Sequence, residues 1–144
     1  MWYNSRYTKG KECAMGTSAL FYTAMPVLLG DRAVAGRLAA EIYCRHGKTA
    51  HWFGTGFHPL LTVYAERHPL PLPFTPENDT VQLTRLKDFA KQQRHSGGLI
   101  CLIPCGETAE AFTTRNGARL GEYYLILPCP EKGVDPLLPL LRRP

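Results

Sequence analysis

Apolar residues gather along the chain in short runs with few polar positions. A run of this length that ends at glycine, proline or a polar turn is typical of a strand buried on both faces of a parallel sheet. The runs predict strands at Pro26–Leu29, Thr49–Phe53, Leu99–Ile103 and Tyr123–Leu127. A further candidate, Leu70–Phe74, contains two prolines that cannot donate backbone hydrogen bonds, so we expect it at a sheet edge or partly irregular.

Helical periodicity separates these runs. Val34, Leu38 and Ile42 recur every four residues after Asp31, which can cap a helix, and Gly47 supplies a C-terminal stop. Further helices are predicted from His58 to Arg67 with Pro59 in the first turn, from Asp79 or Thr80 to about Gln93, and from about Thr108 to Arg115.

Alternation of strands and helices predicts an α/β fold. We expect a three-layer Rossmann-like domain with a mostly parallel sheet of four to five strands and flanking helices. The domain should occupy residues 25–130, because the periodic pattern is confined to that range. Residues 1–24 are expected to be a flexible or edge-strand extension, and residues 131–144 a proline- and leucine-rich tail or linker.

The formal net charge of +5 lies mostly in the two ends of the chain. Five of the 17 basic side chains and one of the 12 acidic ones belong to residues 1–24 and 142–144, which leaves 12 basic and 11 acidic residues between them. A nearly neutral body disfavours a nucleic-acid partner. Since no run of 18 apolar residues occurs, we expect no membrane span either.

Cysteine and histidine usage limits the chemistry further. The five cysteines form an odd set without paired spacing, which favours free thiols and a reducing cytoplasm. The five histidines lack the close pairing or Cys/His clustering of a metal site, so no metal ligand is predicted. No serine or cysteine shows a recognisable pattern of base and orienting group, and no catalytic residue is assigned.

Two turns that follow predicted strands are the candidate ligand positions. Gly30 and Asp31 follow the first strand, and Cys105, Gly106 and Glu107 follow the strand at Leu99–Ile103. Ligands of parallel sheets bind at the carboxyl ends of strands. The first turn lacks the G-x-G-x-x-G spacing of dinucleotide sites, and the chain has no phosphate-loop motif, so unaided nucleotide binding is disfavoured.

Each of these polar residues has a structural alternative. Asp31 would repel a phosphate and is better explained as a helix cap than as a ligand contact. Glu107 can hold an amine or an ordered water. Alternatively, it is there because the helix dipole favours an acidic residue in the first turn of a helix. Cys105 can be imagined as a nucleophile, although an inert buried thiol is the stronger interpretation.

Order and spacing of these segments resemble the N-terminal (preATP-grasp) domain of ATP-grasp ligases, most closely the branch with D-aspartate ligase and carbamoyl-phosphate-synthase-like proteins. The family's PVLLG-type strand and its C-G-[DE] turn match Pro26–Gly30 and Leu102–Glu107. The matching segments, spread over about residues 25–141, also include Glu41–Gly47, Asn116–Leu120 and Tyr124–Pro128. One departure is that Asp31 and Arg32 replace the second Gly or Asn usual at the first turn.

The resemblance implies ligation of a carboxylate to an amine, with ATP and Mg²⁺ bound by the other domains of such ligases. The chain alone is then expected to be inactive, to bind neither cofactor, and to pack on the missing domains or on a second copy. Its two turns would border the cleft for an amino-acid-like substrate. The alternative is a standalone Rossmann-like module that binds a small ligand or another protein.

Overall fold

A computed structural model describes residues 24–93 and 98–129 of the 144-residue chain. Within these residues, five parallel strands form one sheet in the order β4-β3-β2-β5-β6. The strands span Ala24–Gly30 (β2), Ala50–Gly54 (β3), Ala65–Pro69 (β4), Leu99–Cys105 (β5) and Leu125–Ile126 (β6). The α/β fold that the sequence predicts, with a mostly parallel sheet of four to five strands, is therefore confirmed.

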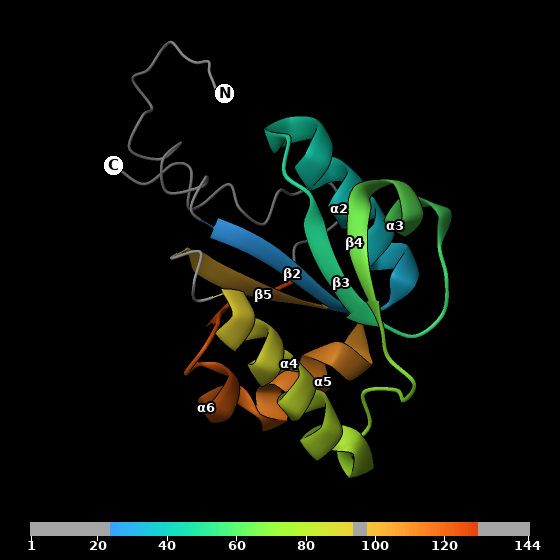
Figure 1. Ribbon diagram of the computed structural model, residues 1–144. Helices are drawn as coiled ribbons and strands as arrows, with labels where there is room; N and C mark the ends of the chain where they lie inside the picture. The colour runs from blue at the N-terminus through green and yellow to red at the C-terminus, as the bar shows by residue number, and fades with distance from the viewer. Residues whose placement is uncertain (1–23, 94–97, 130–144) are drawn as a thin grey trace.

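Helices cover both faces of this sheet, which makes the domain three-layered (Figure 1). One face carries α2 (Arg32–His46) and α3 (Pro59–Tyr64). The other carries α4 (Asp79–Gln93), α5 (Glu107–Arg115) and α6 (Gly117–Leu120), and the turn η1 (Pro76–Asn78) precedes α4. This arrangement is Rossmann-like.

The central strands β2 and β5 supply the core on both sides. Val27 and Leu29 of β2 face the cluster beneath α4 and α5, whereas Leu28 faces the cluster beneath α2. All three side chains are fully buried. These strands are apolar along their whole length because helices bury both of their faces, as the sequence analysis predicts.

Several predicted helix ends are confirmed in detail. The side chain of Asp31 accepts hydrogen bonds from the N–H groups of Ala33 and Val34, and so caps α2. Gly47 ends the same helix in the left-handed conformation, with a φ of 68°. Pro59 lies in the first turn of α3.

The region between β3 and α4 corrects two predictions. The helix expected from His58 to Arg67 ends at Tyr64, and the strand expected at Leu70–Phe74 lies earlier, at Ala65–Pro69. Backbone pairing with β3 decides this: β4 pairs from Ala65 to Pro69 and then meets the two prolines, which have no N–H to donate. As an edge strand with mostly exposed side chains, β4 carries no apolar run that sequence could show.

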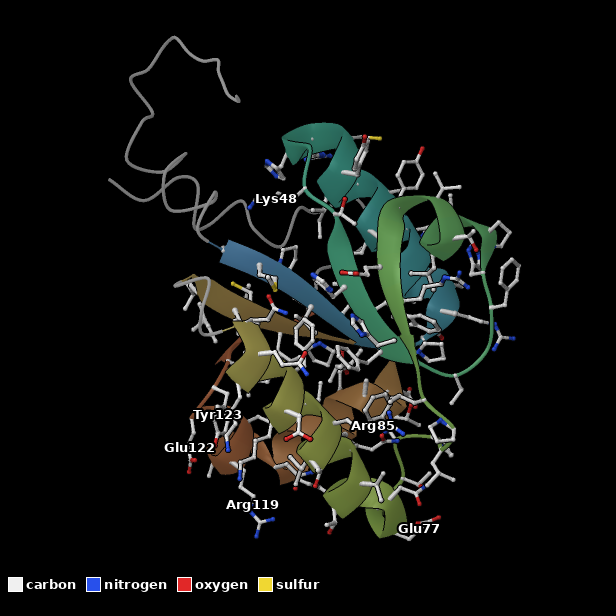
Figure 2. The ribbon with its side chains drawn as sticks, in the orientation of Figure 1. Lys48, Glu77, Arg85, Arg119, Glu122 and Tyr123 are labelled. Carbon is white, nitrogen blue, oxygen red and sulfur yellow. The ribbon has the colours of Figure 1, made fainter. Side chains whose placement is uncertain are left out.

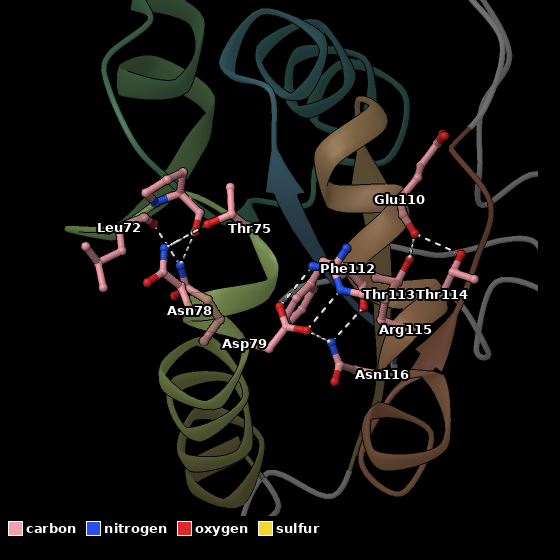
Figure 3. A network of polar contacts seen from close by, with 12 residues as sticks. Leu72, Thr75, Asn78, Asp79, Glu110, Phe112, Thr113, Thr114, Arg115 and Asn116 are labelled. Atoms are coloured by element: carbon pink, nitrogen blue, oxygen red, sulfur yellow. Dashed lines mark hydrogen bonds and ion pairs between the residues drawn. The ribbon is translucent and has the colours of Figure 1, made fainter.

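The carboxylate of Asp79, the first residue of α4, takes part in a long-range contact. It accepts hydrogen bonds from Arg115 and Asn116 at the far end of α5, at 2.9–3.0 Å (Figure 3). This contact joins the start of α4 to the end of α5. The extension before Ala24 and the tail from residue 131 lie outside the described residues.

Candidate functional site

The two turns singled out by sequence meet at one edge of the sheet. The chain runs outward from β2 through β3 to β4, and then returns to place β5 on the other side of β2. Gly30 at the end of β2 pairs with Cys105 at the end of β5. A reversal of strand order of this kind opens a crevice at the carboxyl ends of the two strands, where α/β proteins bind ligands.

Both turns depend on glycine. Gly30 has a φ of 96°, and a Cβ placed there would lie 2.6 Å from the carbonyl oxygen of Cys105 and 2.7 Å from the Cβ of Ala109. Gly106 has a φ of 88°, and its Cβ would lie 2.9 Å from the Cβ of Asp31. The turns are thus packed closely against each other, and neither glycine position leaves room for a side chain of its own.

A pocket of about 630 Å³ opens at this crevice. Its lining residues include Asp31, Arg32 and Glu107, so that one basic and two acidic residues border the same space. Pro73 and Phe74, from the loop after β4, contribute an apolar part of the lining. Four of the five predicted positions, Gly30, Asp31, Gly106 and Glu107, line this pocket, and Cys105 does not.

The two helix N-termini at the pocket differ. The first N–H groups of α2 are occupied by the carboxylate of Asp31. Helix α5 begins after Gly106, which has no side chain to cap it. Glu107, the first residue of α5, is exposed to solvent. An anionic group of a ligand would therefore be better placed at α5 than at α2.

Cys105 is fully buried beside a second thiol, that of Cys129. Its hydrogen bond to Cys129, together with burial, raises the pKa of Cys105, which supports an inert role. The same hydrogen bond, and a further one from the backbone of Gly106, lower the pKa of Cys129. Sequence analysis overlooked Cys129 because it follows the last strand and belongs to no motif.

A cluster of two histidines and a glutamate joins β3 to β4. The Nδ1 atom of His51 lies 3.1 Å from Nε2 of His68 and 3.0 Å from Oε1 of Glu66. Burial lowers the pKa of both imidazoles, and the charge of Glu66 partly opposes this change. This is the only group of metal-ligand type found among residues 24–93 and 98–129.

Sequence spacing could not reveal this cluster. His51 and His68 are 17 residues apart, and they meet because β3 and β4 are neighbours in the sheet. The alternating positions 51 and 53 of β3, and 66 and 68 of β4, place these side chains on one face. That alternation would have been the signal, but the region of Glu66 was predicted to be helical.

A second pocket, of about 380 Å³, lies between α4 and α6. Figure 2 shows Arg119, Glu122 and Tyr123, which line it together with Lys87 and Leu83 of α4. It is remote from the carboxyl ends of the strands and corresponds to no predicted site.

Comparison with known proteins adds no assignment. No protein-family model, curated protein or solved structure matches the chain. Among the residues that the structure describes, no helix has the length and apolar character needed to cross a bilayer.

Proposed function

We propose that this chain is the substrate-side N-terminal domain of an ATP-grasp carboxylate–amine ligase, in which the crevice between β2 and β5 holds an amino-acid-like substrate. The observation that carries the proposal is the meeting of the two family-like segments. Pro26–Gly30 and Leu102–Glu107 pair as adjacent strands, and their turns border one pocket.

Charges at the pocket suit a zwitterion. Arg32 and the uncapped start of α5 can receive a carboxylate, whereas Asp31 and Glu107 can receive an ammonium group. The same two carboxylates would repel a triphosphate. We therefore infer that ATP and Mg²⁺ are bound by other domains, and that this chain contributes binding and orientation of the substrate.

The four cysteines in the described residues are free, in keeping with the reducing cytoplasm that we infer as its location. The partners that we infer are the ATP-binding domains of the ligase or a second copy of the chain, and no nucleic acid.

Titration of the ¹⁵N-labelled chain with amino acids, followed by amide chemical shifts, tests the substrate part of the proposal. We expect saturable shifts at Gly30, Asp31, Gly106 and Glu107 with a free amino acid. Shifts should be weaker with its N-acetyl derivative and absent with ATP and Mg²⁺. Shifts produced by ATP at these amides, or no shift with any amino acid, would contradict the proposal.

A matched pair of variants sharpens this test. Glu107→Gln removes one of the two carboxylates at the pocket and should weaken amino-acid binding. Glu110→Gln, one turn further along α5 and outside the pocket lining, should leave binding unchanged. An equal effect of both substitutions would indicate general electrostatics rather than a contact in the crevice.

The ligase part is tested in the gene, by sequencing beyond the codon for Pro144. A continuing frame that encodes an ATP-binding domain would support it. A stop codon followed by unrelated sequence would instead favour the alternative of a standalone Rossmann-like module, for which the same crevice is the ligand site.

A further inference from the structure

We propose that His51, Glu66 and His68 form a zinc site that joins the edge strand β4 to β3. The site is separate from the crevice between β2 and β5, and it does not depend on the proposed ligase function. It is inferred from the positions of three ligand atoms, from the rings that hold them, and from solvent access on one side.

The three ligand atoms surround a common point. Nδ1 of His51 lies 3.0 Å from Oε1 of Glu66 and 3.1 Å from Nε2 of His68, and all three atoms lie within 4.8 Å of one another. Zinc holds nitrogen and oxygen ligands at about 2.0–2.2 Å, which places neighbouring ligands of a tetrahedral site about 3.3 Å apart. Small side-chain adjustments would bring the atoms to this geometry.

Strand pairing explains why the three side chains converge. His51 pairs directly with Glu66, and Phe53 pairs with His68 in the parallel register of β3 and β4. Because side chains alternate along a strand, these four residues share one face of the sheet. The ligands therefore come from rigid elements of the fold rather than from a loop.

The contacts within the cluster all meet at one atom. His51 presents a single nitrogen, Nδ1, to both Glu66 and His68. A proton on that nitrogen would leave Glu66 and His68 competing for one donor, whereas a proton on Nε2 of His68 would leave the lone pair of Nδ1 facing the carboxylate. A metal ion at the centre would instead bond to all three ligand atoms.

Aromatic rings hold the imidazoles in place from the protein side. Phe53 stacks on His68 with ring centroids 4.4 Å apart, and Phe89 of α4 lies 5.0 Å from His51 and 5.1 Å from His68. On the other side, the side chain of Glu66 is 64% exposed. Solvent can therefore deliver the ion and supply a fourth ligand.

This donor set suits zinc. Two imidazole nitrogens disfavour Mg²⁺ and Ca²⁺, which prefer oxygen ligands. Two histidines and a glutamate with one open position form a known ligand set of four-coordinate zinc. An octahedral Fe²⁺ site with the same ligands would need three open coordination positions. The phenyl rings of Phe53 and Phe89 pack against the imidazoles and leave little room for additional ligands on the protein side.

Binding should stabilise the fold, since β4 lies at the edge of the sheet and, within residues 24–93 and 98–129, pairs with β3 alone. A bridge between the two strands opposes separation of β4, and any ligand that binds the folded state alone raises the unfolding midpoint. The gain should increase with the concentration of free zinc.

Calorimetric titration of the full chain with zinc chloride tests the proposal. We expect one zinc ion per chain and an increase in the unfolding temperature. Replacement of a residue that merely orients a metal ligand costs at least about tenfold in affinity. We therefore expect a larger loss of zinc affinity when a ligand itself is replaced, in each of the variants His51→Gln, His68→Gln and Glu66→Gln. His46→Gln, at the end of α2, is the control and should bind as the wild type does.

Cobalt substitution separates this site from binding by cysteine. We expect the visible spectrum of tetrahedral cobalt with nitrogen and oxygen ligands, without a sulfur-to-cobalt charge-transfer band. Glu66→Gln keeps the test valid if a histidine variant misfolds, because the exposed Glu66 is not part of the core. Absence of zinc binding, unchanged affinity in Glu66→Gln, or a thiolate band would each overturn the proposal.

Discussion

The backbone N–H of Asp31 donates a hydrogen bond to the carbonyl oxygen of Cys105 at 2.9 Å. This bond extends the pairing of β2 and β5 by one residue, into the turns that border the candidate pocket. A second bond, from Nε1 of Trp52 to the carbonyl oxygen of Gly30 at 3.1 Å, ties the first turn to β3 as well. The floor of the crevice is therefore fixed by three strands.

Gly30→Ala is expected to destabilise the chain strongly. Its new Cβ would clash with the carbonyl of Cys105 and with Ala109, and the positive φ would add backbone strain. Together these effects should lower the free energy of unfolding by about 3 kcal/mol, measured by urea denaturation.

Gly47→Ala is the matched control, because Gly47 also has a positive φ, of 68°, but a Cβ there would meet no atom within 4 Å. It should cost about 1 kcal/mol, the strain of the left-handed conformation alone. Equal losses for the two variants would show that the close packing of the turns contributes nothing.

The sequence predicts a part of the fold well where a residue pattern there has a single physical explanation. Strands β2 and β5 are apolar throughout because helices cover both faces, and α2 begins at Asp31 because its carboxylate caps the helix. Strand β4 was missed because its ladder is made by backbone, while its side chains, such as those of Glu66 and Arg67, face water. Propensity carries no information about such a strand until its partner is known.

The same limit applies to the sites. Glycine and acidic residues after buried strands located the crevice, since the carboxyl ends of parallel strands share one edge. The cluster of His51, Glu66 and His68, and the contact between Cys105 and Cys129, depend on which distant segments lie side by side. No spacing along the chain records that relationship.

Gln82→Met should loosen one wall of the crevice. The Nε2 atom of Gln82 donates to the carbonyl oxygens of Leu72 and Pro73, and the side chain is almost fully buried. Methionine keeps the length of the side chain but removes the hydrogen bond to the carbonyl of Leu72, whereas the carbonyl of Pro73 keeps its bonds from Thr75 and Asn78. The substitution also removes the unpaired Oε1 that the wild-type residue buries. We expect a net loss of about 1–2 kcal/mol in unfolding free energy.

Hydrogen exchange locates that effect. Amides of the loop after β4, including that of Phe74, should exchange faster in Gln82→Met than in the wild type. Thr84→Ala removes an exposed hydroxyl from the same helix and should change neither exchange nor stability by more than about 0.5 kcal/mol. Unchanged exchange in Gln82→Met would show that this side chain does not hold the loop.

Cys129 should react with iodoacetamide well before the buried thiols do. Hydrogen bonds from Cys105 and from the backbone of Gly106 lower its pKa, and its side chain is half-buried rather than enclosed. Burial raises the pKa of Cys101 to about 11 and shields the sulfur. Peptide mass spectrometry after timed alkylation at neutral pH should therefore find Cys129 modified and Cys101 intact.

A variant separates the hydrogen bond from simple exposure. Cys105→Ala removes the thiol whose interaction with Cys129 lowers the pKa of Cys129, so that pKa should rise and the pH midpoint of its alkylation should move upward. If the midpoint stays where it is, the contact between the two thiols does not control reactivity.

The contact between Asp79 and Arg115 should make stability fall in acid. Hydrogen bonds from Arg115, and also from Asn116, lower the pKa of Asp79 below its ordinary value of 3.8. In the unfolded chain the carboxyl takes up its proton at higher pH than in the folded chain. Its contribution to the free energy of unfolding is therefore full above about pH 4 to 5 and is lost as pH falls through the lower folded pKa.

Asp79→Asn should therefore have a lower unfolding temperature than the wild type at pH 6, and the difference should shrink below pH 3.8. Asp88→Asn, at an exposed position of the same helix, should show no such convergence, and a wild-type advantage that persists undiminished at pH 2 would contradict this role for Asp79.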